Sequence, residues 1–417
     1  MSRRVTVLVL TWNGLDYTKK CVESILERST YPNYELLVVD NGSTDGTVEY
    51  LKGLGSRIRT IFNETNLGFA KGNNVGLQGL TNDVILLNND IIITQDDWIE
   101  KLQACADADA KVGVVGCRMT SPDGHLHHAG AFMPVGTFRG QQLAGNQIDV
   151  GQYNLNREVE SVVAAVFYLT TECLEKVGPL DPDYFSYFED TDYCLKARKA
   201  GLKVMYCGEV SLLHYQNVST AVNKVSFSDM YYKGQSIFLS KWQGFYDNKY
   251  QQSIAWRSWF FQPPGYGNCS RHMTVALDEL NVKVFPRFLD PTEASAPINE
   301  NEPFHDILHR TGENPEIEVA FSWGDLFHRN EGRIKVGYTM LEVDGLPAEW
   351  VRQANLMDEV WVPSAFNVET FKASGVTKPI VHMPLGYDPN YFNPGIKGFR
   401  ADDRFTFLSI FEWGERK

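Results

Sequence analysis

Apolar runs alternate with amphipathic segments along the first 110 residues. Nearly unbroken apolar runs are typical of strands covered on both faces, and they lie at Val5–Leu10, Leu36–Val39 and Val84–Leu87; a further strand is expected near Arg57–Phe62. The segments between them carry apolar residues at helical spacing, as in residues 21–26. This alternation predicts an α/β domain in which helices cover a doubly wound parallel sheet.

The strand at residues 83–88 ends in the polar sequence Asn88-Asn89-Asp90. In open α/β sheets, ligands bind in the crevice outside the carboxyl ends of the strands. Asn88, Asn89 and Asp90 therefore offer hard oxygen atoms where a phosphate-bound Mg²⁺ or Mn²⁺ can sit. Considered alone, the same residues could equally turn the chain or cap the helix that begins near residues 95–98.

A new set of strands begins after residue 250. The expected strand at Ile254–Phe261 is followed by Gly265-Tyr266-Gly267-Asn268 and a helical segment, and a strand, a glycine turn and a helix open a Rossmann-like domain. Later strands are expected at residues 282–284, 318–321, 335–338 and 359–362. We predict a first domain at residues 1–242, a linker at 243–252, a second domain at 253–402 and the start of a further unit at 403–417.

Composition and charge exclude several classes of protein. The chain has 417 residues and a net charge of -13, which argues against a nucleic acid partner because such surfaces need a basic footprint. Its seven cysteines are odd in number, scattered and without a Cys-x-x-Cys pair, so neither a disulfide framework nor a zinc ribbon is expected. No apolar stretch approaches the ~18 residues of a membrane span. We expect a cytoplasmic protein that is soluble or, at most, peripheral at the inner face of the membrane.

Five blocks within residues 3–240 resemble the signature sequences of family 2 glycosyltransferases. The last block is similar to that of the rhamnosyl- and galactofuranosyl-transferase branch. The resemblance implies a GT-A fold and an inverting, metal-dependent transfer of a sugar from a UDP- or dTDP-linked donor to a glycan or lipid-linked acceptor, in bacterial surface polysaccharide synthesis. The blocks are Thr11-Trp12-Asn13, Val39–Thr47, Asn66–Gly76, Leu86–Asp90 and Gly178–Tyr193.

The resemblance also implies a donor site. Asp40 would accept the imide N–H of uracil or thymine, although it could instead open a helix beside Ser43 and Thr44. The glycines Gly68, Gly72 and Gly76 either allow the backbone to approach the diphosphate or permit close helix–sheet packing. The implied donor-binding set is Thr11, Trp12, Asn13, Asp40, Gly68, Lys71, Asn74, Asn88 and Asn89.

Asp90 is the implied ligand for Mn²⁺ or Mg²⁺. The family's usual pair of aspartates is reduced to one, with Asn88 in the earlier position, and an amide oxygen is a weaker ligand than a carboxylate. Related members place a metal-binding histidine after the Glu-Asp block, which makes His214 the second implied ligand. A lone histidine can also be an ordinary core or surface residue.

Three carboxylates open the helix that follows residue 188. Acidic residues in a first helical turn stabilise the helix dipole, which is a sufficient structural reason for them. The resemblance implies that Asp190 is the general base that deprotonates the acceptor hydroxyl, with Glu189 as the rival for this role. Asp192 would bind the acceptor or hold the loop.

Two further segments receive no catalytic role. Residues 123–130 contain three histidines, and they either bind metal or form a loop that lines the acceptor cleft. Residues 161–170 are expected to form a buried strand that supports the region around Asp190.

The second half resembles the N-terminal part of family 4 glycosyltransferases of the GT-B fold. The resemblance rests on residues 265–268, 362–366 and 384–394; it departs at Glu412, where a phosphate-binding arginine is common and for which Arg416 or Lys417 could substitute. Only about a dozen residues follow the start of the expected strand at 405–410, too few for a covered sheet. We therefore expect an incomplete GT-B fold and one donor site per chain, in the first half.

Two other functions fit the general pattern. Nucleotidyl transfer uses a similar sheet, but the first loop lacks a glycine-rich run with an arginine before a proline. A glycan-binding module derived from an enzyme would be expected to lose Asp40, Asp90 or Asp190, and all three are present.

Overall fold

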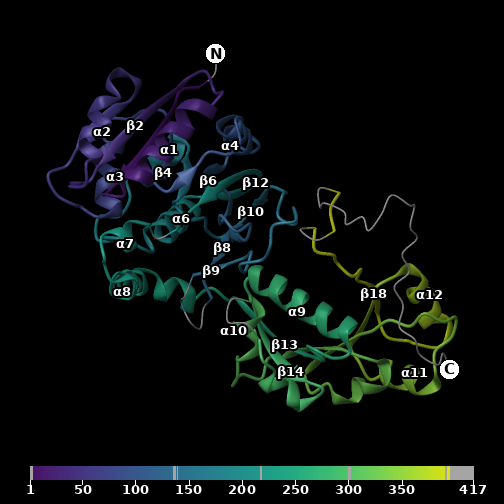
Figure 1. Cartoon of the computed structure of the whole chain (residues 1–417). Coiled ribbons are helices and arrows are strands. Elements are labelled where there is room, and N and C mark those ends of the chain that lie inside the picture. The colour runs from purple at the N-terminus through teal and green to yellow at the C-terminus, as the bar shows by residue number, and fades with distance from the viewer. Residues whose placement is uncertain are drawn as a thin grey trace.

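The computed structural model describes residues 3–134, 138, 140–216, 218–298, 302–389 and 392–394. The two α/β units follow each other along the chain, and α8 leads from the first to the second (Figure 1). The expected strand at residues 405–410, Glu412, Arg416 and Lys417 lie outside the described residues.

The first unit contains a large mixed sheet. Its strand order is β10-β12-β6-β11-β4-β1-β2-β3, with β5 paired to β12 and β7 paired to β6. Its elements are β1 (Val5–Thr11), α1 (Leu15–Arg28), β2 (Tyr34–Asp40), α2 (Thr47–Gly53), β3 (Arg59–Phe62), α3 (Phe69–Leu77), β4 (Asp83–Asn88), β5 (Ile91–Ile92), α4 (Trp98–Asp107), β6 (Val112–Thr120), β7 (Leu126–His128), β8 (Ala131–Phe132), β9 (Gln141–Gln142), β10 (Arg157–Glu158), β11 (Val166–Leu169), α5 (Thr171–Val177), α6 (Glu189–Lys199), β12 (Lys203–His214), α7 (Val218–Val222) and α8 (Phe227–Asp247).

The predicted α/β class is confirmed, but the sheet is not wholly parallel: β5, β7 and β10 pair antiparallel with their neighbours, and so does β11. β1 to β4 pair in parallel as expected. β11, however, lies antiparallel between β4 and β6. The expected strand over residues 161–170 is also shorter, since the strand spans Val166–Leu169 and Ser161 forms an isolated bridge with Ala131. Residues 162–165 instead run along the wall of the pocket described below.

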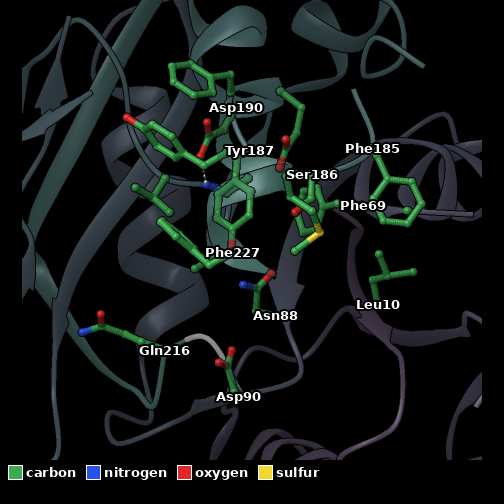
Figure 2. A pocket seen from close by; sticks show the side chains of 18 of the residues that line it. Leu10, Phe69, Asn88, Asp90, Phe185, Ser186, Tyr187, Asp190, Gln216 and Phe227 are labelled. Atoms are coloured by element: carbon green, nitrogen blue, oxygen red, sulfur yellow. Dashed lines mark hydrogen bonds between the residues drawn. The ribbon is translucent and has the colours of Figure 1, made fainter. Parts of the chain in front are cut away.

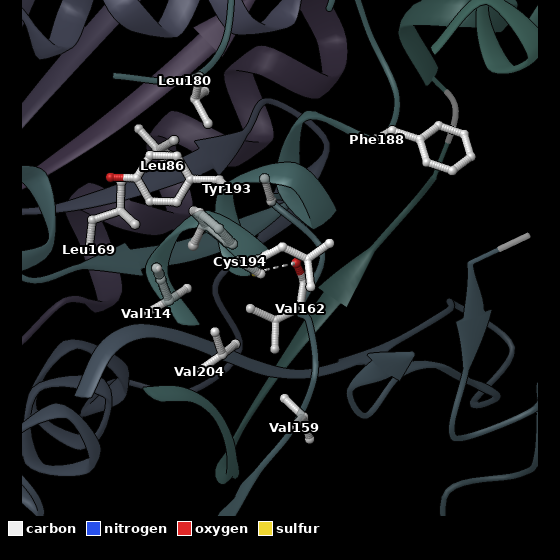
Figure 3. Packing of buried hydrophobic residues seen from close by; sticks show 14 of the residues in the cluster. Leu86, Val114, Val159, Val162, Leu169, Leu180, Phe188, Tyr193, Cys194 and Val204 are labelled. Carbon is white, nitrogen blue, oxygen red and sulfur yellow. Dashed lines mark hydrogen bonds between the residues drawn. The ribbon is translucent and has the colours of Figure 1, made fainter. Parts of the chain in front are cut away.

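Alternating side chains of the central strands give the sheet two apolar faces. On β4, Val84 and Leu86 point to the core that contains α6, and Ile85 and Leu87 point to the core that contains α1 and α4. Figure 3 shows Leu86 and Leu169 packed near Tyr193 and Cys194 of α6. A strand that is buried on both faces is continuously apolar, which explains the pattern of β4.

The second unit has the predicted parallel sheet, in the order β14-β13-β15-β16-β17-β18. The expected glycine turn at residues 265–268 is wrong, because α9 already begins at Pro264. A Cβ added at Gly267 would lie 2.8–2.9 Å from the backbone of Phe260 and Phe261, so close packing accounts for this glycine. The elements are β13 (Gln252–Ser258), α9 (Pro264–Glu279), β14 (Val282–Phe288), α10 (Phe304–Leu308), β15 (Ile317–Phe321), β16 (Ile334–Tyr338), α11 (Ala348–Ala354), β17 (Glu359–Val362), α12 (Ala365–Ala373) and β18 (Ile380–His382).

Candidate active site

A cavity of about 450 Å³ opens at the carboxyl ends of β1 and β4. The strand order reverses at this point, because β1 has β2 on one side and β4 on the other. Such a switch point is where open α/β sheets bind ligands. Figure 2 shows Leu10 of β1, Asn88 at the end of β4, Asp90 just after β4, and Asp190 of α6 around this cavity.

Asp90 and His214 meet at one side of the cavity. Asp90 Oδ1 lies 3.2 Å from His214 Nε2, and the two residues are 4% and 5% exposed. Sheet pairing explains the approach, since His214 ends β12 and pairs with Ile91 of β5, next to Asp90. The backbone N–H of Tyr215 also donates to the carbonyl oxygen of Asp90, at 3.1 Å.

These two side chains fit a divalent cation. Asp90 Oδ1 is buried and receives no hydrogen bond of good geometry from the described residues, and an imidazole nitrogen faces it. Carboxylate oxygen and imidazole nitrogen are both ligands of Mn²⁺. Within the described ranges, no group of three or more His, Cys, Asp or Glu is arranged to hold a metal. A cation here would therefore need further oxygen ligands, such as those of a diphosphate.

The expected donor-binding residues at the ends of β1 and β4 have two roles: some line the cavity, and others hold the two strand ends together. Trp12, Asn88 and Asn89 line the cavity. The Asn89 amide, however, donates to the hydroxyl oxygens of Thr11 and Thr18, each at 3.1 Å, so Asn89 and Thr11 join the two strand ends.

Asn13 bridges the first two loops. Its side-chain oxygen accepts the N–H of Thr44 at 2.8 Å, and its own N–H donates to Ser43 Oγ at 2.8 Å. Its amide also contacts Asn223, which follows α7. These contacts place Asn13 in the framework of the site.

Asp40 lies at the end of β2 and is 1% exposed. Its Oδ2 accepts the backbone N–H groups of Gly42 and Ser43, at 3.2 and 3.0 Å. Its Oδ1 is buried without a hydrogen-bond partner among the described residues. One oxygen is thus used by the loop, and the other remains able to accept a hydrogen bond.

The glycines of residues 66–76 permit close packing. A Cβ at Gly72 or Gly76 would meet Leu10 or Leu8 of β1 at 2.8 and 2.4 Å. Gly68 has φ +84°, and a Cβ there would lie 2.6 Å from the carbonyl oxygen of Phe185. This oxygen accepts the N–H of Phe69, which fixes the loop before α6 against the start of α3.

Lys71 and Asn74 lie off the cavity wall. Lys71 is exposed. The Asn74 side chain instead exchanges two hydrogen bonds with the backbone of Leu180, at 2.7 and 2.9 Å. Asn74 therefore anchors the segment that leads to α6.

Glu189 and Asp190 both line the cavity at the start of α6. Asp190 Oδ2 accepts the N–H of Ala164 at 3.2 Å, and Oδ1 accepts the N–H of Thr191 at 2.7 Å. Burial raises the pKa of Asp190, and these backbone donors oppose the rise. Burial and then the charge of Asp190 raise the pKa of Glu189 well above its ordinary value. The pair therefore favours an ionised Asp190 beside a neutral Glu189.

Asp192 is placed away from the cavity. It is fully buried, and its carboxylate accepts a hydrogen bond from Trp242 Nε1 at 2.8 Å and forms an ion pair with Lys196 at 2.7 Å. Because Trp242 belongs to α8, Asp192 joins α6 to α8. Of its two expected roles, holding the structure is the one that these contacts match.

His127 belongs to the histidine-rich segment at residues 123–130, for which the sequence predicts no catalytic role. It lines the cavity, and its Nδ1 lies 3.0 Å from Nδ1 of His214. Burial, followed by the neighbouring His214 and His128, lowers the pKa of His127 to about 2. The sequence contains one usable signal, the crowding of three histidines in four residues, but the acidic partner comes from Asp90, far away in the chain.

At its switch point, the sheet of the first unit thus has a cavity with the Asp90–His214 carboxylate–imidazole pair on one wall and the buried acidic pair Glu189–Asp190 on another. Residues 6–151 match the sequence model of the family described as Glycosyl transferase family 2. The first unit is therefore similar to family 2 glycosyltransferases over residues 6–151, and a second unit with a parallel, Rossmann-like sheet follows it.

Three curated relatives match part of this chain. An uncharacterized protein of Sinorhizobium fredii, y4gI, is 29% identical over 228 residues, which are 52% of this chain and 25% of the relative. The O-antigen biosynthesis protein RfbC of Myxococcus xanthus is 25% identical over 234 residues, 54% of this chain and 18% of RfbC. The N-acetylglucosaminyl-diphospho-decaprenol L-rhamnosyltransferase of Mycobacterium tuberculosis is 24% identical over 267 residues, 58% of this chain and 85% of that enzyme. The chain thus spans a quarter or less of the length of the first two.

Proposed function

We propose that this protein moves a sugar from a UDP- or dTDP-linked donor to a glycan or lipid-linked acceptor, with inversion, and that the transfer requires Mn²⁺ or Mg²⁺. One observation carries the proposal: the same cavity has Asp90 and His214 on its wall and Asp190 at the start of α6. The family match over residues 6–151 supports it.

The residues have separate tasks in this proposal. Asp90 and His214 hold the cation, with Asn88 beside them. A bound cation offsets the charge that develops on the leaving diphosphate. Asp190 accepts the proton of the acceptor hydroxyl, while neutral Glu189 adds no second charge to the cavity. Asp40 presents Oδ1, which has no partner among the described residues, to the imide N–H of the donor base.

The acceptor is proposed to carry a lipid. An apolar groove of about 260 Å³ runs between the Phe185-Ser186 segment and α8, and Met230, Gly234 and Ile237 also line it. Phe185, Ser186 and Met230 line the cavity as well, so the groove continues from the reaction site. The names of two relatives, an O-antigen biosynthesis protein and a rhamnosyltransferase acting on a diphospho-decaprenol, favour a lipid-linked acceptor in bacterial surface polysaccharide synthesis.

This acceptor would place the protein in the cytoplasm or peripherally at the inner face of the membrane. Across the part of the chain that the structure describes, no helix is both long and apolar enough to span a bilayer. Access to a lipid-linked acceptor would then depend on the groove and its surroundings.

We also propose that the second domain is the N-terminal half of a GT-B-type, family 4-like transferase. Its parallel sheet in the order β14-β13-β15-β16-β17-β18 supports this assignment. We propose no donor site in it.

The test of the main proposal is a screen of UDP- and dTDP-sugars for Mn²⁺-dependent hydrolysis, followed by transfer to a lipid-linked glycan. We expect one donor to be turned over, EDTA to stop the reaction, and Asp190→Asn to reduce turnover by ~10²-fold or more while donor binding persists. Turnover that survives EDTA would contradict the metal role, and near-normal turnover of Asp190→Asn would remove Asp190 as the base.

A further inference from the structure

His127 is held beside the Asp90–His214 pair by an irregularity in the sheet. β7 pairs antiparallel with β6 through Thr120–Leu126 and Met119–His128, so His127 is an extra residue between two consecutive pairs. Such a β-bulge re-aims a side chain, and bulges are enriched next to active sites. Here the His127 ring lies 4.8 Å from the His214 ring, centroid to centroid.

The neighbouring histidine shows what an ordinary core role looks like. His128 Nδ1 lies 2.5 Å from Gln142 Oε1, and its Nε2 accepts the backbone N–H of Val163 at 3.4 Å. Both nitrogens of His128 thus have partners in the protein framework. His127 Nδ1 instead faces His214 Nδ1, at 3.0 Å.

This contact constrains the tautomer of His214. Two imidazole nitrogens at hydrogen-bond distance need one N–H and one lone pair between them. If neutral His214 donates from Nδ1, its Nε2 keeps a lone pair facing Asp90 Oδ1. If His127 donates instead, a neutral His214 carries its hydrogen on Nε2 and cannot bind a cation there. A metal-binding histidine usually donates its other N–H to a neighbouring acceptor.

We infer that His127 is a positioning residue that accepts the Nδ1–H of His214 and so keeps the Nε2 lone pair of His214 available to the cation. The inference rests on the proposed function, because it assumes that Asp90 and His214 bind a metal. His127 itself does not bind the metal; it sets the orientation and tautomer of the ligand that does.

The test compares two His127 variants in the full chain by measuring Mn²⁺ affinity in the presence of UDP, with free Mn²⁺ followed by electron paramagnetic resonance. His127→Phe keeps a ring but has no acceptor, and we expect it to weaken Mn²⁺ binding about 10- to 100-fold. His127→Gln retains an acceptor oxygen and should stay close to wild type. His125→Ala, in the same segment but bonded to Asp123, is the control and should bind Mn²⁺ normally.

A second measurement does not depend on affinity. With ¹⁵N-labelled histidine and the diamagnetic Mg²⁺–UDP complex, we expect nitrogen–proton correlation spectra to show His214 protonated at Nδ1. Wild-type Mn²⁺ affinity in His127→Phe, an equal loss in His127→Gln and His127→Phe, or a His214 proton at Nε2 would each overturn the inference while leaving the proposed function intact. A wild-type protein that binds neither UDP nor Mn²⁺ would instead remove the proposed function, and this inference with it.

Discussion

At the scale of single residues, the two adjacent carboxyl groups at the start of α6 lie in different environments. Asp190 is held by backbone N–H groups, whereas Glu189, next to it, has a buried Oε2 without a hydrogen-bond partner among the described residues. Two adjacent carboxyl groups in one cavity resist double ionisation. Asp190, the proposed base, and Glu189 are therefore distinguished by contacts that no sequence motif specifies.

Glu189 gives a prediction for stability against pH. Its raised pKa means that the folded protein binds more protons than the unfolded chain above the ordinary glutamate pKa of about 4.3, so stability falls as pH rises toward the raised value. Glu189→Gln removes this proton uptake and should flatten the decline. Thermal unfolding of wild type and Glu189→Gln from pH 4 upward tests this prediction. The melting temperature of wild type is expected to drop relative to that of the variant as pH increases. Parallel curves for the two proteins would show that Glu189 is not held neutral.

At the scale of elements, the Phe185–Phe188 segment connects the start of α3 to Glu189 and Asp190 at the start of α6. Tyr187 and Phe188 both have positive φ, 69° and 71°, directly before α6. The hydrogen bond from Phe69 N–H to the Phe185 carbonyl ties this strained turn to α3. Gly68 is the residue that permits this contact.

Gly68→Ala should therefore disturb the cavity, and Gly79→Ala is its matched control. Both glycines have positive φ, +84° and +77°, but Gly79 has no atom within 4 Å of an added Cβ. We expect Gly79→Ala to destabilise the protein by about 1 kcal/mol from backbone strain alone, with sugar transfer unchanged. Gly68→Ala should cost about 2–4 kcal/mol because overpacking adds to the strain, and it should lower transfer. Denaturant unfolding and sugar-transfer assays of the two variants test this prediction. Equal effects of the two substitutions on stability and transfer would mean that the contact of Gly68 with Phe185 is unimportant.

The elements differ in how far the sequence predicts them. The ends of β1, β2 and β4 were predictable neighbours, because parallel strands bring their carboxyl ends to one edge. The antiparallel insertion of β11 was not, since apolar periodicity does not reveal a pairing partner. The contacts of His127 with His214 and of Asp192 with Trp242 span 87 and 50 residues, and only the folded sheet and helices bring these side chains together.

The groove along α8 gives a prediction about the acceptor. Ile237 lines the groove, whereas Phe245 lies on the same helix, is 49% exposed and is not among the groove residues. If the groove holds the lipid, Ile237→Asp should raise KM for a lipid-linked acceptor and leave KM for the donor unchanged, because a charge in an apolar groove disfavours a hydrocarbon chain. Phe245→Asp should leave both constants unchanged. Steady-state kinetics with a lipid-linked and a lipid-free acceptor provide the comparison, and an equal effect on both acceptors would contradict lipid binding there.

At the scale of the whole molecule, two α/β sheets of different type follow one another. The cavity at the carboxyl ends of β1 and β4 lies in the first, and its lining residues all precede α9. The second sheet is linked to the segment after α8 partly through Asp278 of α9, which binds Lys249, Tyr250 and Arg310 at 3.1, 2.7 and 2.6 Å. On this account, nucleotide binding belongs to the first domain.

The central claim is that the cavity in the first domain is a metal-dependent nucleotide-sugar site. Calorimetric titration of UDP and dTDP into the full chain, with and without Mn²⁺, tests it most directly when wild type is compared with Asp40→Ala and Asp90→Ala. We predict one site per chain, about tenfold or more tighter with Mn²⁺. Asp40→Ala should abolish binding, and Asp90→Ala should remove the effect of Mn²⁺. Two sites per chain, binding that survives Asp40→Ala, or an affinity that Mn²⁺ does not change would contradict the claim.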